Sequence, residues 1–182
     1  MLKKMGEAVA RVARKVNETV ENDLDTLDLA ECKLVSFPVG IYKVLRNVAG
    51  RIHLIILANN ELQALSSKFM TTFSQLRELR LEGNALHHLP DEVSTLTHLK
   101  AIDLSRNQFQ DFPEKLTALQ ALETINLEEN AIVGLADHHP SVFGASFIQI
   151  LEYPSTSLCL PRLAFSSPSV SLGTPLFSGL EG

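Results

Sequence analysis

LRELRLEGNALHHLP, Leu76 to Pro90, is the stretch that decides the fold, because the same pattern follows it twice at a constant spacing. The second copy, LKAIDLSRNQFQDFP, begins at Leu99, and the third, LETINLEENAIVGLA, begins at Leu122, so the copies start 23 residues apart. More divergent copies begin upstream at Ile52 and Leu24. A fixed period of this length indicates a solenoid, in which one small structural unit is stacked repeatedly. About five repeats are therefore expected between residues 24 and 136.

Apolar and polar residues alternate at the start of each copy, as they do in a strand with one buried face. Leu79 and Leu81 occupy the buried positions of one copy, and Ile102 and Leu104 those of the next. One copy cannot bury these side chains alone, whereas stacked copies form a continuous core with a parallel sheet along one side. The third, fifth, seventh and eighth positions of each copy should face solvent, and together they define what we call the sheet face.

An asparagine occupies the ninth position of four copies, as Asn60, Asn84, Asn107 and Asn130. A buried amide can donate two hydrogen bonds and also accept, so this column can satisfy backbone groups where each strand turns away. Cys32 stands at the equivalent position of the first copy, where we expect a buried structural thiol rather than a reactive one.

The combined pattern, L-x-x-L-x-L-x-x-N-x-L-x-x-L-P, resembles the intracellular leucine-rich repeat family in its 23-residue form. Compact members without a second domain are the most similar, apart from a divergent C-terminal tail in this chain. The resemblance implies an α/β solenoid with a parallel sheet on its concave side and short helices or turns on its convex side. It also implies a protein-binding scaffold without catalytic residues or cofactors.

Residues 1–23 are predicted to form an N-terminal helical cap. Val9, Val12, Val16 and Val20 fall on one stripe of a helix, and a cap would use this stripe to cover the first repeat. A mitochondrial presequence and a membrane-surface helix are the alternatives, since the segment is basic. The acidic residues that follow it favour the cap.

An insertion and an unusual strand distinguish the first two repeats. The stretch GIYKVLRNVAGR (40–51) has helical apolar spacing and should form a convex helix that ends at Gly50. Leu54 and Ile56 then occupy positions that belong to the sheet face. Either the register differs locally or an apolar spot is exposed there, as at a partner contact.

The remaining sheet face is predicted to be acidic. It carries seven acids, Asp28, Glu31, Glu78, Glu82, Asp103, Glu128 and Glu129, and two arginines, Arg80 and Arg106. Arg80 and Asp103 share a column on adjacent strands and are expected to pair. Such a surface favours a partner with a basic surface. The candidate partner-binding residues are therefore Leu54, Ile56, Glu78, Arg80, Glu82, Asp103, Arg106, Glu128 and Glu129.

The sequence offers no convincing chemistry. The pairs His87-His88 and His138-His139 lack a third ligand at a spacing that would hold zinc, and no phosphate-binding loop or nucleophile motif occurs. Glu128 and Glu129 are consecutive at a strand end and should splay apart, which gives no defined acid-base geometry. No catalytic residue, metal site or cofactor is expected.

Composition narrows the compartment and the partner. The net charge is −5, which disfavours nucleic acid, and two cysteines do not make a disulfide framework. No signal peptide or long apolar run is evident, so we expect a soluble cytoplasmic protein that does not bind membranes. A monomer is expected, with a risk of association at its C-terminal end.

The charged repeat pattern stops before residue 137. From Ser141 to Gly182 there are nine serines, four prolines and only three charged residues, so residues 137–182 are predicted to be a weakly ordered tail. The segment FGASFIQILEY (143–153) is apolar enough to lie on the open end of the stack as a strand or helical turn. We expect an alternative C-terminus, produced by splicing or a reading-frame change, joined to residues 24–136.

Three functions follow from these features. The leading one is a scaffold or interaction module that binds a partner protein on the concave face. The second is an inhibitor or regulator of an enzyme or signalling protein that uses the acidic sheet face, as the ribonuclease-inhibitor type does with longer repeats. An enzyme is the third and the least supported.

Overall fold

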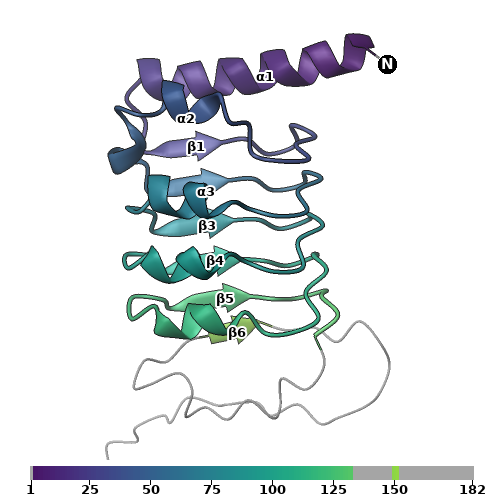
Figure 1. Ribbon diagram of the computed structural model, residues 1–182, viewed down its shortest axis with the longest axis vertical. Helices are drawn as coiled ribbons and strands as arrows, with labels where there is room; N and C mark the ends of the chain where they lie inside the picture. The colour runs from purple at the N-terminus through teal and green to yellow at the C-terminus, as the bar shows by residue number, and fades with distance from the viewer. Residues whose placement is uncertain (1, 133–148, 152–182) are drawn as a thin grey trace, which may run out of the picture.

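The structure is a computed structural model, and it describes residues 2–132 and 149–151. Each repeat contributes one short strand followed by a turn and a short helical segment (Figure 1). In chain order the elements are α1 (Leu2–Glu21), β1 (Thr26–Asp28), α2 (Ile41–Val44), the 3-10 helix η1 (Ala49–Arg51), β2 (Leu54–Ile56), α3 (Ser67–Thr72), β3 (Glu78–Arg80), η2 (Asp91–Thr95), β4 (Ala101–Asp103), η3 (Glu114–Ala118), β5 (Thr124–Asn126) and β6 (Gln149–Leu151).

The strands form one parallel sheet in sequence order, from β1 below α1 to β6 at the far end (Figure 1). Register partners occupy equivalent positions of successive repeats. Ile55, for example, is the partner of Leu79, and Leu79 is in turn the partner of Ile102. This architecture confirms the predicted leucine-rich repeat solenoid with a parallel sheet.

The central row of the sheet is apolar from β1 to β5. Each of its side chains is at most 1% exposed, so the row forms the sheet side of the core, made of Leu27, Ile55, Leu79, Ile102 and Ile125. Burying this row stabilises every repeat through its neighbours, because no single repeat could cover its own strand.

The last strand lies in the segment that was predicted to form a strand or a helical turn on the open end of the stack. Gln149–Leu151 pairs in parallel with β5, and Ile150 is the register partner of Ile125. Over residues 2–132 and 149–151 the sheet has six strands, one more than the five copies recognised in the sequence. The rest of the predicted tail lies outside the described residues.

The asparagine column links neighbouring repeats, as predicted. Oδ1 of Asn107 accepts from the backbone N–H of Leu86 at 3.0 Å, and its Nδ2 donates to the carbonyls of Leu81 at 2.9 Å and Leu104 at 3.0 Å. Asn60, Asn84 and Asn130 make the equivalent bonds in their own repeats. Each amide thus satisfies backbone groups of two repeats at once.

Cys32 begins this column in the first repeat. Its backbone N–H donates to Oδ1 of Asn60, and its thiol lies 3.4 Å from the carbonyl oxygen of Ala30. Burial raises the pKa of the Cys32 thiol, with opposing contributions from Lys15 and Arg11. A raised pKa disfavours the reactive thiolate, which fits a structural thiol.

The eighth position of each repeat adopts a left-handed backbone conformation where the strand turns away. The φ angles are between 52° and 68° at Glu31, Asn59, Gly83, Arg106 and Glu129. A β-carbon on Gly83 would lie 2.5 Å from Oδ1 of Asn59, so this glycine provides room as well as a permitted φ.

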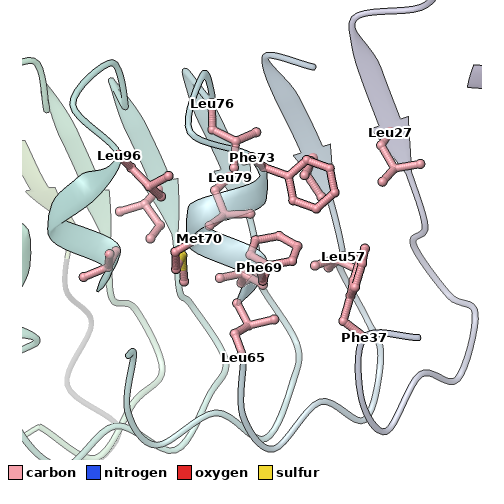
Figure 2. Packing of buried hydrophobic residues seen from close by; sticks show 14 of the residues in the cluster. Leu27, Phe37, Leu57, Leu65, Phe69, Met70, Phe73, Leu76, Leu79 and Leu96 are labelled. Carbon is pink, nitrogen blue, oxygen red and sulfur yellow. The ribbon is translucent and has the colours of Figure 1, made fainter. Parts of the chain in front are cut away.

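An aromatic cluster fills the core beside the long first repeat. Phe37 lies 5.0 Å from Phe69 and 5.9 Å from Phe73 between ring centroids, both in edge-on arrangements. Figure 2 shows these three rings together in the core, near Leu57 and Leu79. Large rings fill the extra space that the longer repeat creates, and edge-on pairs add to the free energy of burial.

The predicted convex helix is shorter than expected. Helix α2 ends at Val44 with Leu45 as its C-cap, and Gly50 lies inside the separate 3-10 helix η1 instead of ending a longer helix. The apolar stripe is still used, since Ile41, Leu45 and Val48 are buried. Packing against the core therefore matters more here than a continuous helix.

Helix α1 lies along the end of the stack and contacts β1 and α2 (Figure 1). Val12 and Val16 are buried, and the hydroxyl of Thr19 donates to the carbonyl of Thr26 at 3.1 Å. Val9 is 69% exposed, so the predicted valine stripe is only partly covered by the first repeat.

Candidate protein-binding surface

The register of the strands arranges the sheet face in rows. The row of third positions contains Thr26, Leu54, Glu78, Ala101 and Thr124. The row of fifth positions contains Asp28, Ile56, Arg80, Asp103 and Asn126. Because side chains alternate along a strand, both rows lie on the face opposite the core.

Leu54 and Ile56 form what we call the β2 patch. Both side chains are half-buried, while Ile55 between them is fully buried. The register of β2 with β1 and β3 is regular, so no local shift places them in the core. Of the two explanations left open by the sequence, an apolar spot on the sheet face is therefore the one observed.

Arg80 pairs along its own strand. Its Nε donates to Oε1 of Glu78 at 2.6 Å, and this hydrogen bond is the main reason that the pKa of Arg80 is raised. Asp103 is the register partner of Arg80, as the sequence predicted, but the ion pair of Arg80 is with Glu78. The expected cross-strand pair is thus replaced by one between residues two apart on the same face.

Asp103 binds polar groups of its own repeat and the next. Its Oδ1 accepts from the Ser105 hydroxyl at 2.7 Å and from the Ser105 backbone N–H at 2.9 Å. Its Oδ2 accepts from Nδ2 of Asn126 at 3.1 Å. These hydrogen bonds hold the carboxylate in place and explain why it does not need Arg80.

The same backbone bond recurs at the fifth position of three repeats. Asp28 accepts from the N–H of Ala30 at 2.9 Å, and Asn126 accepts from the N–H of Glu128 at 3.0 Å, as Asp103 does from Ser105. Short polar side chains commonly make this local bond. Ile56 has no atom that could accept it.

The remaining predicted contact residues lie further along the strands. Glu82 and Glu128 are half-buried at seventh positions, while Arg106 and Glu129 are exposed at the left-handed eighth positions. Within the part of the chain that the structure describes, Oε2 of Glu82 is buried and has no hydrogen-bond partner. A buried carboxylate oxygen in this state is costly unless it gains a donor.

Helix α1 contributes a charge that sequence reasoning missed. Nζ of Lys15 lies 3.2 Å from Oδ1 of Asp28, and a guanidinium nitrogen of Arg11 donates to the carbonyl of Glu31 at 3.0 Å. The acidic character of the sheet face is therefore reduced at β1. The basic face of the helix was the only available signal, and it did not specify these partners.

The histidine pair lies away from the sheet face. The rings of His87 and His88 are exposed, with centroids 4.6 Å apart, and they line a hollow with Phe109 and Lys115. Among residues 2–132 and 149–151, no group of three or more His, Cys, Asp or Glu side chains could hold a metal ion. His138 and His139 lie outside the described residues.

None of the described helices is both long enough and apolar enough to span a bilayer.

Comparison with known proteins agrees with the repeat geometry. A family model described as "Leucine rich repeat" matches residues 50–109 and 74–132. Two curated relatives, both called leucine-rich repeat-containing protein 20, are 86% identical in Homo sapiens and 80% identical in Mus musculus over 96 residues. This similarity covers 53% of the chain and 52% of each relative, so the chain spans about half the length of the curated relatives it matches.

Solved structures show the same fold. The leucine-rich repeat domain of the type III effector XopL has a TM-score of 0.58 at 20% identity, covering 81% of this chain and 58% of that one. A Shigella effector leucine-rich repeat domain has a TM-score of 0.54 at 20% identity, covering 83% of this chain and 60% of that one. At this level of identity the similarity concerns the fold alone.

Proposed function

The repeat region of this chain, residues 50–132, belongs to the leucine-rich repeat family, and on that premise we propose that the chain is a protein-binding module without catalytic activity. Repeat domains of this kind are typical of protein–protein interaction. The partner protein would bind across the sheet face, through the nine residues predicted from the sequence.

The observation that carries this proposal is the β2 patch on an otherwise polar surface. Leu54 and Ile56 lie on the sheet face without joining the core. Apolar side chains rimmed by polar and charged ones are characteristic of protein-interaction sites. The flanking strands supply that rim through Asp28, Glu78 and Arg80.

Affinity capture with charge-reversed variants tests the proposal. Arg80→Glu and Glu128→Lys should each lose the partner that the wild-type chain captures, because each reverses a charge on the sheet face. Glu114→Lys is the matched control, since it makes the same change at an exposed residue of η3. Unchanged capture by both test variants would instead assign the contact to the convex side or to α1.

A second candidate function is the inhibition or regulation of an enzyme or signalling protein. The excess of acids on the sheet face supports it, because an acidic surface can cover a basic active site. Association with such a target should slow as salt is added. A rate independent of ionic strength would argue against this candidate while leaving the binding module intact.

We also propose several broader properties of the chain. The net charge of −5 supports a protein partner over nucleic acid or a membrane, and a monomeric cytoplasmic protein is consistent with it. The division into a cap (1–23), a solenoid (24–136) and a divergent C-terminal tail (137–182) likewise stays a proposal.

A further inference from the structure

We propose that the β2 patch recognises a partner segment in which an aliphatic or aromatic side chain is followed closely by a lysine or arginine. This inference rests on the proposed function and specifies the chemistry of the partner. The apolar side chain would cover Leu54 and Ile56, and the cation would reach the carboxylates of β3 and the residues just after it.

The β2 patch serves no polar role inside the protein. On β1, β4 and β5 the fifth-position side chain accepts a hydrogen bond from the backbone two residues later. Ile56 cannot, and it contributes apolar surface where the other side chains are tied to their own backbone. An apolar contact with a partner is therefore the interaction available at β2.

The charge beside the patch is predominantly negative. Leu54 is the register partner of Glu78, and Ile56 is the register partner of Arg80. Arg80 is held by Glu78 at 2.6 Å, and its positive charge is also influenced by Glu82 and Asp103. Three carboxylates therefore surround one guanidinium, which leaves negative charge for a cationic partner to balance.

Glu82 is the carboxylate with the least internal support among these three. Its Oε2 is buried without a hydrogen-bond partner in the described part of the chain. The backbone bond from the Asn59 N–H to the Glu82 carbonyl, at 2.8 Å, places this residue beside the end of β2. An ammonium or guanidinium group could supply the missing donor after a side-chain rotation.

The spacing of the strands sets the spacing of the partner's residues. Neighbouring strands are about 4.8 Å apart, and an extended chain advances about 3.3 Å per residue. A segment crossing the sheet from β2 to β3 would thus place its cation one or two residues from its apolar anchor. Long lysine and arginine side chains extend that reach slightly.

Selection from a phage-displayed library of random peptides on the immobilised chain tests this inference. Enriched peptides should combine an aliphatic or aromatic residue with a lysine or arginine one to three positions away. One enriched peptide, synthesised with a fluorescent label, then serves as the probe for titrations by fluorescence anisotropy.

The decisive variant is the double substitution Leu54→Thr with Ile56→Thr. Threonine already occupies the third position of β1 and β5, so the strand should tolerate it. We expect the peptide to bind at least about tenfold more weakly. Glu82→Gln should weaken it by about threefold, more at low salt. Val39→Thr with Val44→Thr is the matched control, because these exposed valines lie outside the sheet face, and it should change the affinity by less than about twofold.

The possible failures are distinguishable. The inference is rejected if no peptide is enriched, if enriched peptides lack the basic residue, or if the double threonine variant binds like the wild type. If that variant binds normally but Glu128→Lys loses the captured partner, sheet-face binding stands and only the inference fails. If neither variant has an effect, the proposed function fails as well. Circular dichroism melting curves confirm that each variant is folded.

Discussion

Two regions of the sheet face share one backbone register but differ in how their side chains are satisfied. On β4 and β5, Asp103 and Asn126 bond to each other and to their own backbones. On β2, Leu54 and Ile56 have no polar bonds to make, and β3 beside them carries the Glu78–Arg80 ion pair. A regular repeat can therefore build one internally bonded surface and one surface suited to a partner.

The regularity itself comes from features that the two regions have in common. The buried row and the asparagine column continue from one region into the other. Repeat stability therefore depends on neighbours, while the outward residues are free to vary. Substitutions in the shared framework and in the differing surfaces should consequently have effects of different size.

The largest effect should come from the aromatic cluster behind β2. Phe69→Ala removes a fully buried ring that contacts Phe37 and Phe73, and it should lower the free energy of unfolding by about 3 to 5 kcal/mol. Urea denaturation followed by circular dichroism measures this loss. Val39→Ala, at a site 73% exposed, is the control and should have little effect. A loss below about 1 kcal/mol would show that the cluster does not support this part of the stack.

Loss of a shared asparagine should have the next largest effect. Asn107→Ala leaves the Leu86 N–H and the Leu81 and Leu104 carbonyls without their side-chain partner, at a cost of about 1 to 3 kcal/mol. The same denaturation assay applies, with the exposed Gln108→Ala as its control. Equal stabilities for the two variants would contradict the proposed linking role of the column.

A smaller effect is expected where the two regions meet at Gly83. Gly83→Ala combines a φ of +68° with a contact to Asn59, and it should destabilise the fold by about 1 to 3 kcal/mol. Adding Asn59→Ala removes the contact but leaves the φ unchanged. The double variant should therefore lose less than the sum of the single variants. Strict additivity would mean that the contact with Asn59 does not contribute.

The smallest effects should distinguish the two surfaces directly. Asp103→Ala breaks the bonds to Ser105 and Asn126 and should cost about 0.5 to 1.5 kcal/mol. Arg80→Gln breaks only an exposed ion pair and should cost at most about 1 kcal/mol, less at high salt. Thermal melts at two salt concentrations compare them. A larger loss for Arg80→Gln would reverse the assignment of the internally bonded surface to β4 and β5.

The fold could be predicted from the sequence because its leucines and asparagines repeat at a fixed period. The strand register, the asparagine bonds and the outward direction of Leu54 and Ile56 all follow from that period. Period alone cannot predict which side chain a charged residue selects. Arg80 could reach Asp103 or Glu78, and the choice depends on rotamers and on the bonds that Asp103 already makes.

Contacts between distant segments were also beyond the sequence pattern. The pairing of Lys15 with Asp28 depends on how α1 lies on the first strand, and the aromatic cluster depends on how the long repeat folds back. The exact limits of β6 belong to the same class, because its segment does not carry the repeat motif. Tertiary packing decides these features, while local periodicity does not.

Hydroxyl-radical footprinting of the chain with and without its captured partner protein tests the central claim most directly. If the partner binds the sheet face at β2, Leu54 and Ile56 should be protected from oxidation, while the exposed Val39 and Val44 should react as before. Unchanged oxidation of Leu54 and Ile56, together with protection of the two valines, would contradict the account.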